Sequence, residues 1–337
     1  MKIGVIGDGI IGTAVAASIL KFHRTAQVTL IDDGRPYKTS QAGQGYLWSI
    51  HRYDDKIGFQ TSLLAKEAWK DLLGDDELLE KKGSLLISPK DENELRQYFE
   101  RAKVGIEELK FVDDAATMNQ ALKSDKFYGV YFPDDYTCTP PELIDILKER
   151  YDLKLEKRSV RCLEDELQES KVDYLIVCAG PWINELKDVG VEPIRGVLLE
   201  VDSGKDIDSK SLTNDVPVME YGYGGCGFHF TLSCRNGKYL VGASREDVGF
   251  STENLDKVEC SILEHAKVFL KSDALAQTCD VRVGYRPLCI DQRSLDRKYS
   301  VTQLETNKRI ILLYGFEGQG VLYAPLAGLD VLDLLKH

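Results

Sequence analysis

Apolar positions at the start of the chain follow the order strand, glycine turn, helix and strand. The runs Lys2–Ile6 and Gln27–Ile31 are short, apolar and rich in β-prone residues, as buried parallel strands are. Between them lie the glycine-rich Gly7–Gly12 and the stretch Thr13–Phe22, which we expect to be helical. The chain therefore opens with a βαβ unit, which predicts a parallel sheet of the doubly wound type.

Further elements follow in a mixed order. Helices are expected at Phe59–Leu73, Glu92–Lys103, Glu142–Arg150, Thr252–Leu270 and from the last glycine loop to Leu335. Strands are expected at Ser84–Ile87, Tyr128–Phe132, Val172–Cys178 and Arg309–Tyr314. From about residue 196 to 283 the pattern becomes one of β-hairpins, and Asn236-Gly237 between two apolar runs is a strong hairpin signal. This order predicts two domains that are interleaved in sequence.

Composition and charge argue against several classes of function. The 337 residues are enough for about two domains, and the formal net charge of −12 argues against a nucleic-acid partner, because phosphate binding requires clustered Lys and Arg. No apolar run approaches the roughly 20 residues of a transmembrane helix, and no secretory or transit signal stands at the N-terminus. The eight cysteines are scattered without a CxxC pair, which predicts reduced thiols, no metal site and a cytoplasmic location.

The segment Gly7–Gly12 has the G-x-G-x-x-G spacing of a dinucleotide-binding turn. Gly7 suits the tight turn, Gly9 lets the backbone approach a pyrophosphate, and Gly12 lets helix and strand pack closely. The helix that follows offers N–H groups and a positive dipole end to the phosphates. Asp32 comes about 20 residues later, where a carboxylate accepts hydrogen bonds from ribose hydroxyls and disfavours the 2′-phosphate of NADP. Asp33 is a second, weaker candidate for the same role.

These opening residues resemble the D-amino acid oxidase, glycine oxidase and sarcosine oxidase family of FAD enzymes. Later segments resemble that family in the same order, namely Thr39–Gly45, Val177–Trp182, Gly242–Phe250, Gly284–Pro287 and Gly315–Gly320. The stretch TSQAGQGYLW is similar to the same loop in plant and bacterial members of that family. The resemblance implies an α/β fold: a doubly wound, glutathione-reductase-like FAD-binding domain (1–83, 134–195 and 284–337) interleaved with an antiparallel β-sheet substrate domain (84–133 and 196–283).

The same resemblance implies a non-covalent FAD site. Its residues, besides the three glycines of the turn, Asp32 and Asp33, are Ile10, Ile11, Ser40, Gly43, Gln44, Gly45, Val160, Ala179, Gly180, Trp182, Arg286, Gly315, Gly318, Gln319, Gly320 and Val321. Cys289 lies near the position of the covalent flavin in monomeric sarcosine oxidases, but the surrounding pattern differs from theirs. Asp8 also departs from the family, which usually has Ala there, and an acid beside the pyrophosphate is unfavourable unless it points away.

Four residues are implied on the substrate side. Arg286 belongs to a G-x-R-P motif whose arginine pairs with a substrate carboxylate, and the alternative is an arginine that binds backbone carbonyls at a strand end. His229 stands where sarcosine oxidases carry the lysine that assists oxygen activation, and the alternative is a hydrogen-bonded histidine on a strand. Tyr221 and Tyr223 lie in a glycine-rich segment that suits a mobile lid or a pocket wall.

The resemblance implies oxidation of a small amine or amino acid by hydride transfer to flavin N5, with O₂ or another acceptor reoxidising the flavin. A same-fold alternative is a dehydrogenase of 2-hydroxy acids or polyols. A third reading is a FAD-binding protein without turnover, as a subunit of an oxidase complex, and a homo-oligomer is equally compatible with the sequence. His51 and Arg52 follow the flavin-side loop, where they bring positive charge to the site or form a solvated turn.

Overall fold

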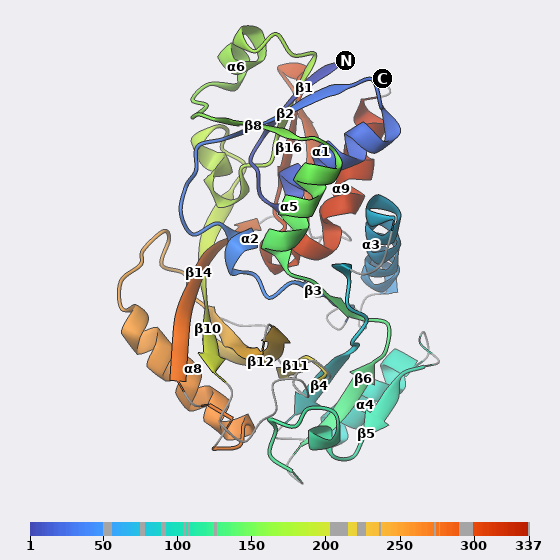
Figure 1. The fold of residues 1–337 in the computed structure, drawn as a ribbon, viewed down its shortest axis with the longest axis vertical. Coiled ribbons are helices and arrows are strands. Elements are labelled where there is room, and N and C mark those ends of the chain that lie inside the picture. Colours follow the sequence, from blue (N-terminus) through green and yellow to red (C-terminus); the bar gives the residue numbers. More distant parts are fainter. Residues whose placement is uncertain are drawn as a thin grey trace.

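The computed structural model describes residues 1–49, 56–74, 78–88, 92–103, 106, 108–124, 127–202, 215–220, 227–235, 237–272, 274–275, 277–289 and 299–335. Within these residues the chain forms two large sheets and a small one, the latter made of β3 (Tyr46–Leu47) and β7 (Tyr136–Thr137). Figure 1 shows the two large sheets toward opposite ends of the long axis.

The first large sheet is parallel except at one edge, where β15 and β16 are antiparallel. Its strands, in spatial order, are β15 (Ser300–Leu304), β16 (Asn307–Tyr314), β9 (Tyr174–Val177), β1 (Lys2–Ile6), β2 (Gln27–Asp32) and β8 (Lys154–Lys157). Ile6 pairs with both Ile31 and Val177, so β1, β2 and β9 end at one edge of the sheet. This confirms the predicted βαβ start and parallel sheet.

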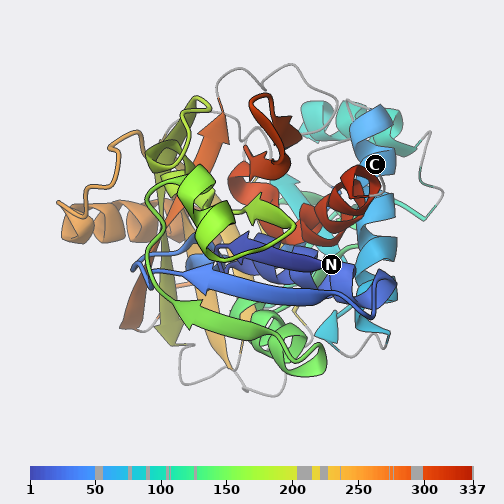
Figure 2. The ribbon, with the colours of Figure 1, turned by 90° about the horizontal axis from the view of Figure 1, so that it is seen from above.

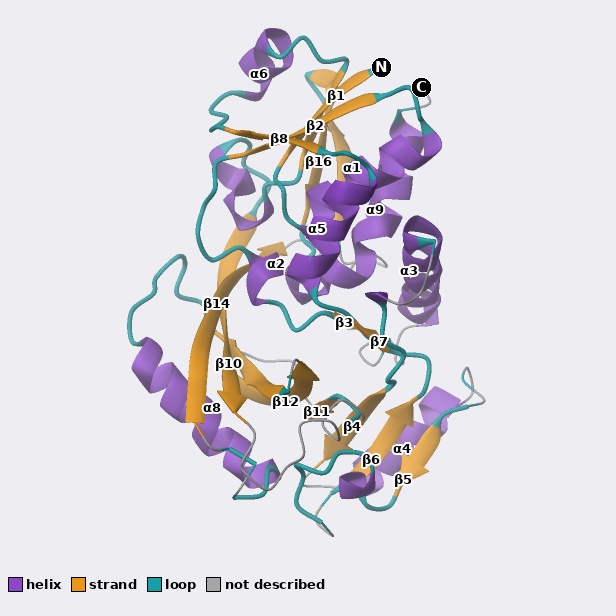
Figure 3. Cartoon of the chain, in the orientation of Figure 1, coloured by secondary structure: helices purple, strands orange, loops and turns teal. Residues whose placement is uncertain are grey.

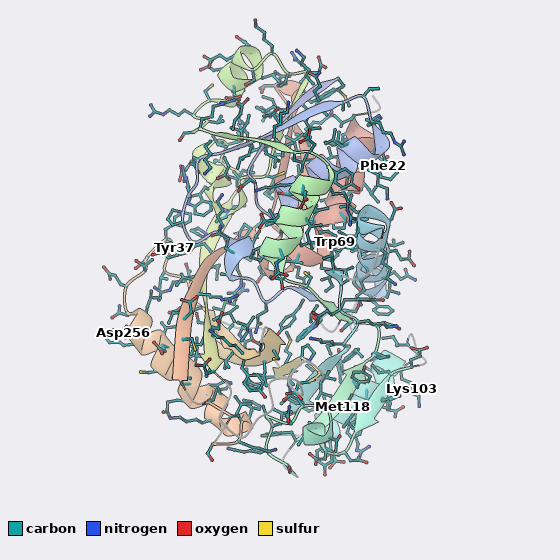
Figure 4. The ribbon with its side chains drawn as sticks, in the orientation of Figure 1. Phe22, Tyr37, Trp69, Lys103, Met118 and Asp256 are labelled. Atoms are coloured by element: carbon teal, nitrogen blue, oxygen red, sulfur yellow. The ribbon has the colours of Figure 1, made fainter. Side chains whose placement is uncertain are left out.

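Helices cover both faces of this sheet. One face carries α1 (Ile10–Phe22), α3 (Lys56–Leu73), α5 (Pro140–Arg150) and α9 (Gly320–Leu334). The other face packs against α6 (Leu163–Glu169) and the 3₁₀ helix η4 (Gly180–Glu185). Figures 1 and 2 show α3 and α9 side by side. The buried Trp69 lies at this contact (Figure 4), where its Nε1 donates to the carbonyl of Val321 at 2.7 Å and so fixes the start of α9.

The second large sheet is antiparallel except for the β11–β4 pair. Its strands, in spatial order, are β14 (Gln277–Cys289), β10 (Val191–Asp202), β13 (Lys238–Arg245), β12 (Gly227–Arg235), β11 (Val218–Glu220), β4 (Ser84–Ser88), β6 (Tyr128–Phe132) and β5 (Lys110–Val112). Figure 3 shows α8 (Leu255–Phe269) beneath β14, β10 and β12, and α4 (Glu92–Lys103) beside β6 and β5. Short helical turns complete the described elements: α2 (Thr39–Ala42), η3 (Ala115–Thr117) and η6 (Glu317–Gln319).

Alternating side chains divide the second sheet into two faces. Val197, Val241 and Phe230 belong to a buried cluster that packs against α8. Leu198 and Thr231, which directly follow Val197 and Phe230 on the same strands, face the opposite side and line the cavity. The sequence therefore provides an apolar core on one face and a wall that is open for binding on the other.

Two strands cross the domain boundaries expected from the sequence. β10 and β14 pair in one register from Val191↔Cys289 through Gly196↔Gly284 to Glu200↔Asp280, and after a register shift the pairing continues to Asp202↔Gln277. Boundaries at 195/196 and 283/284 therefore fall inside continuous strands of the second sheet. The G-x-R-P motif lies within β14, which the hairpin pattern did not reveal because its paired strand is some eighty residues away along the chain.

Candidate functional site

A cavity of about 820 Å³ lies between the two sheets. Its walls come from the carboxyl ends of β1, β2 and β9, the open face of the second sheet, and the segment that joins β16 to α9. Ligand sites in α/β folds form at this edge of a parallel sheet, and the volume is within the range of small-molecule pockets.

In the glycine turn after β1, Gly7 and Gly12 leave no room for a side chain, and Gly7 and Gly9 line the cavity. Gly7 has φ +104°, and a Cβ there would lie 2.3 Å from the carbonyl oxygen of Cys178. A Cβ at Gly12 would lie 1.9 Å from the carbonyl oxygen of Gly7. Gly9 lines the cavity, and its nearest neighbour to such a Cβ is the hydroxyl of Ser40 at 3.2 Å. The backbone of Gly9 is thus open to the cavity.

The N-terminus of α1 points at the same cavity. Gly9 is its N-cap and offers no capping side chain, and the first turn carries no acid. The N–H of Ile10 donates to Ser40 Oγ at 3.0 Å, whereas the N–H groups of Ile11 and Gly12 have no partner within the helix. Gly9, Ile10 and Ile11 all line the cavity, so this helix end is suited to an anion.

Asp8, which lies beside this helix end, forms ion pairs with two lysines. Its carboxylate accepts from Lys38 Nζ at 2.6 Å and from Lys148 Nζ at 2.9 Å. Burial raises the pKa of Asp8, but the two lysines outweigh it and hold that pKa at about 2. The sequence left open whether this acid opposes a phosphate group, and the structure shows it neutralised by its neighbours.

Asp8 is therefore expected to stabilise the folded protein in a defined pH window. Because the folded-state pKa is lowered from 3.8 to about 2, its contribution is present above pH 4 and is lost as the pH falls toward 2. The gain amounts to about 2 kcal/mol at most. Urea unfolding of wild type and Asp8→Asn between pH 2 and 6 should show a shallower acid loss in the variant. Parallel curves for the two proteins would contradict the assignment.

Asp32 is held in place at the end of β2. Its carboxylate accepts from Lys38 Nζ at 2.5 Å, from the N–H of Gly34 at 2.7 Å and from the N–H of Asp8 at 3.2 Å. Asp33 instead pairs with Arg35 at 2.6 Å. Asp32 is thus the fixed carboxylate next to the glycine turn, while Asp33 belongs to a more exposed ion pair.

A cluster of charged and aromatic side chains, formed by Arg35, Glu185 and Trp182, borders the cavity near η4. Arg35 binds Glu185 through two hydrogen bonds of 2.6 Å, and its guanidinium lies 5.5 Å from the centre of the Trp182 ring. Trp182 stacks on Phe250 with ring centres 5.5 Å apart. Tyr37, on the loop after β2, lies beside β14 (Figure 4), so this loop contacts both sheets.

The open face of the second sheet provides the opposite wall. His229 on β12 is only 7% exposed and lines the cavity with Thr231 and Met219. Trp48 stacks on Tyr46 with ring centres 3.7 Å apart. The buried polar atoms Thr231 Oγ1, Trp48 Nε1 and Gln319 Oε1 have no hydrogen-bond partner among the described residues. Because buried polar atoms are normally paired, their gathering at the cavity indicates that a ligand completes them.

Arg286 lies on β14 at the junction of the two walls. Its Nη1 donates to the carbonyl of Ser244 at 3.0 Å, which is the structural role left open by the sequence. Arg286 also lines the cavity, and a Cβ at Gly196 would lie 2.6 Å from its guanidinium. Gly196 is therefore needed to make room for the side chain. Arg245, two strands away, also lines the cavity and pairs with Glu317.

The structure brings most of the predicted site residues together. All the predicted cofactor-binding residues except Gly12 line the cavity, including Val160. Gly12 instead packs the turn. Tyr221, Tyr223, His51 and Arg52 lie outside the described residues. The glycine-rich segment expected as a lid is bounded by strands on both sides, because Glu220 closes β11 and Gly227 opens β12.

Sequence reasoning missed several charged residues that line the cavity or lie beside it. Lys38 and Arg35 stand next to predicted positions, and their charges in an anion site could have drawn attention to them. Lys148 had no such signal, because it comes from α5 and is 140 positions from Asp8. Arg245 and Glu317 each stand inside a motif that the resemblance identified, yet nothing in either motif indicates that they form an ion pair.

Metal ligands and membrane spans can be assessed over the same described residues. No group of three or more His, Cys, Asp or Glu side chains gathers there as a set of metal ligands. None of the helices in this part of the chain combines the length and apolar character needed to span a bilayer.

The fold, with two large sheets and a cavity at the carboxyl edge of the parallel one, agrees with the FAD-dependent oxidoreductase family. Residues 2–334 match the family model described as FAD dependent oxidoreductase, of the DAO class, and the chain belongs to this family. FAD is its cofactor, and the predictions of the family, the fold class and an oxidoreductase are confirmed.

Individual relatives agree with this assignment. The chain is 28% identical over 212 residues to D-aspartate oxidase 2 of Caenorhabditis elegans, a match that spans 60% of this chain and 61% of that protein. Its fold is similar to iminodiacetate oxidase from Chelativorans sp. BNC1, with a TM-score of 0.78, 18% identity and coverage of 99% and 95% of the two chains. Glycine oxidase from Geobacillus kaustophilus gives a TM-score of 0.77, 19% identity and coverage of 99% and 94%.

Proposed function

We propose that this enzyme oxidises a small amine or amino acid that carries a carboxylate. The observation that carries the proposal is the position of Arg286, which lines the cavity between the glycine turn and the open sheet face. A planar guanidinium binds a carboxylate through two parallel hydrogen bonds. The names of the relatives support this class, since aspartate, iminodiacetate and glycine are all amino acids with a carboxylate.

The cofactor fits the wall formed by β1, β2 and the C-terminal loop. The end of α1 and the backbone of Gly9 suit the pyrophosphate, and Asp32 suits the ribose hydroxyls. The loop Gly315–Gly320 and the start of α9 suit the flavin ring, because their N–H groups and dipole favour negative charge. When bound, FAD supplies a hydride acceptor at its N5 atom.

The chain's own residues then orient the substrate and exclude water. Arg286 fixes the carboxylate, so that the carbon bearing the amine is held toward the flavin. His229 is buried on the opposite wall, where it brings a short, rigid imidazole side chain to the cavity lining. The stacked Tyr46 and Trp48 close the apolar side of this chamber.

The decisive experiment is anaerobic bleaching of the flavin absorbance with a panel of substrates. Amino acids, N-methyl amino acids and hydroxy acids are mixed separately with the holoenzyme. Bleaching by an amino acid, with release of ammonia or of an amine-derived aldehyde, supports the proposal. Bleaching only by a hydroxy acid, with a keto acid and no ammonia, would favour the dehydrogenase alternative. A flavin that no member of the panel reduces would favour a FAD-binding subunit.

We further propose that FAD is held without a covalent bond. Cys289, the cysteine nearest the expected attachment position, is buried and lines the cavity, and its Sγ donates to the carbonyl of Val189 at 3.8 Å. Acid or heat should therefore release yellow FAD into the supernatant. Colour that stays with the precipitate would show a covalent link.

Gly9→Ala is expected to remove FAD while leaving the fold largely intact. Gly9 has φ −69°, which alanine adopts freely, and Ser40 Oγ is the one atom of the described residues that the added methyl would contact. We expect FAD affinity to fall at least about tenfold, or ~1.4 kcal/mol, and the folded state to lose under about 1 kcal/mol. FAD titration and urea unfolding of the apoprotein measure the two effects. Gly12→Ala is the control, because its methyl collides with the backbone of Gly7 and should disrupt the turn itself.

A further inference from the structure

Four charged side chains from distant segments meet beside the glycine turn. Lys38 Nζ lies 2.6 Å from Asp8 Oδ1 and 2.5 Å from Asp32 Oδ1, so it bridges the two acids. Lys148 Nζ, from α5, lies 2.9 Å from Asp8 Oδ2. The four side chains are between 11% and 22% exposed, so solvent screens them only in part.

The charges of this cluster balance only because both lysines are present. Lys38 is shared between Asp8 and Asp32, whereas the contacts of Lys148 in the cluster are with Asp8 alone. Removal of Lys148 therefore leaves one surplus negative charge on Asp8. That residue directly follows Gly7 and precedes Gly9, at the end of the helix that is suited to an anion.

We propose that Lys148 sets the affinity for FAD by neutralising Asp8, so that the glycine turn accepts the pyrophosphate despite an acid within it. Lys148 acts through Asp8 and is a positioning residue. Lys38 complements it by pairing with the other carboxylate oxygen of Asp8 and by holding Asp32 at the end of β2. This inference rests on the proposed placement of the pyrophosphate at Gly9.

The placement in the fold explains why a helix so far along the chain supplies this charge. α5 packs against α1 and α2, next to the end of β1. Lys148 lies in the last turn of α5, and Leu147 beside it is fully buried in the core below the first sheet. The backbone that carries Lys148 is thus fixed, which directs the ammonium group to Asp8.

The test is a titration of apoprotein with FAD, followed by flavin fluorescence, for a set of matched variants. Lys148→Met should lower FAD affinity at least tenfold. Asp8→Asn should leave affinity equal to or above that of wild type. The double variant Asp8→Asn/Lys148→Met should return to within threefold of wild type, because the surplus negative charge is gone. Arg150→Met removes an exposed charge from the same helix end and should have no effect.

Two outcomes would overturn the inference. Unchanged affinity in Lys148→Met would show that the ion pair does not matter for FAD. A double variant as weak as Lys148→Met would show that Lys148 acts by a route other than Asp8. If Lys148→Met fails to fold by circular dichroism, Lys148→Gln and the double variant provide the same comparison. Wild-type apoprotein that binds no FAD would overturn both this inference and the proposed function, whereas failure in the variants alone overturns only the inference.

Discussion

Lys66→Met is expected to lower the free energy of unfolding by about 3–5 kcal/mol, because it leaves a buried carboxylate without its counter-charge. Lys66 Nζ lies 2.6 Å from Asp135 Oδ1, 2.7 Å from Ser49 Oγ and 3.1 Å from the carbonyl of Asp134. The side chains of Lys66 and Asp135 are only 5% and 2% exposed. Asp135 also accepts from Ser84 Oγ and from the N–H of Ser49, so the pair joins α3, β4 and the segment after Trp48.

The neighbouring Lys81–Asp134 pair provides a matched control. Its side chains are about half exposed and its atoms lie 2.7 Å apart. An exposed pair contributes at most about 1 kcal/mol, so Lys81→Met should change stability little. Urea unfolding of the apoproteins measures both. The double variant Lys66→Met/Asp135→Leu should recover part of the loss, because an apolar pair needs no counter-charge. Equal small losses for Lys66→Met and Lys81→Met would show that burial does not strengthen the first pair.

This pair also bears on the cavity. Ser49 directly follows Trp48, and both its N–H and its hydroxyl are held by the Lys66–Asp135 pair. Trp48 lines the cavity, and its Nε1 has no hydrogen-bond partner within the part of the chain that the structure describes. The buried ion pair therefore fixes the position of an aromatic wall that faces the substrate chamber.

The fold could be predicted where local rules decide it. The glycine turn requires Gly7 and Gly12 because backbone atoms occupy the space of a side chain, and the spacing alone reveals this. The hairpin at Asn236-Gly237 was equally local: Arg235 pairs with Lys238 across the predicted two-residue connection. Such elements depend on residues close together in the chain, so the sequence pattern contains the whole signal.

Features that depend on distant segments were harder to predict. β14 is the edge strand of the second sheet and reaches the cavity. Its partner β10 lies some eighty residues earlier in the chain, so the pattern of apolar residues did not show where β14 begins. The Lys148–Asp8 contact joins residues 140 positions apart, and the Lys66–Asp135 pair joins residues 69 positions apart. A single sequence gives the charge of each residue but does not indicate which opposite charge it will meet.

Arg286→Ala is expected to weaken binding of a carboxylate ligand by about 2–5 kcal/mol, while the FAD content stays close to that of wild type. Arg286 faces the cavity from β14, and a Cβ placed on Gly318 in the C-terminal loop would lie 3.9 Å from its aliphatic stem. Because each ~1.4 kcal/mol is a factor of ten, affinity should fall well over tenfold. Arg286→Lys should restore little, since an ammonium group cannot reproduce the planar pair of donors.

The measurement is a titration of flavin absorbance with benzoate or a slow substrate, on wild type and both variants. Arg282→Ala is the matched control: Arg282 lies on the same strand, but its guanidinium pairs with Glu200 outside the cavity lining. Equal affinity for the carboxylate ligand in wild type and both Arg286 variants would show that Arg286 has a structural role, through its hydrogen bond to the carbonyl of Ser244. The anionic group would then have to bind at Arg245, where it must displace the carboxylate of Glu317. Glu317→Gln should in that case increase affinity for the carboxylate, a result that Arg286 binding does not require.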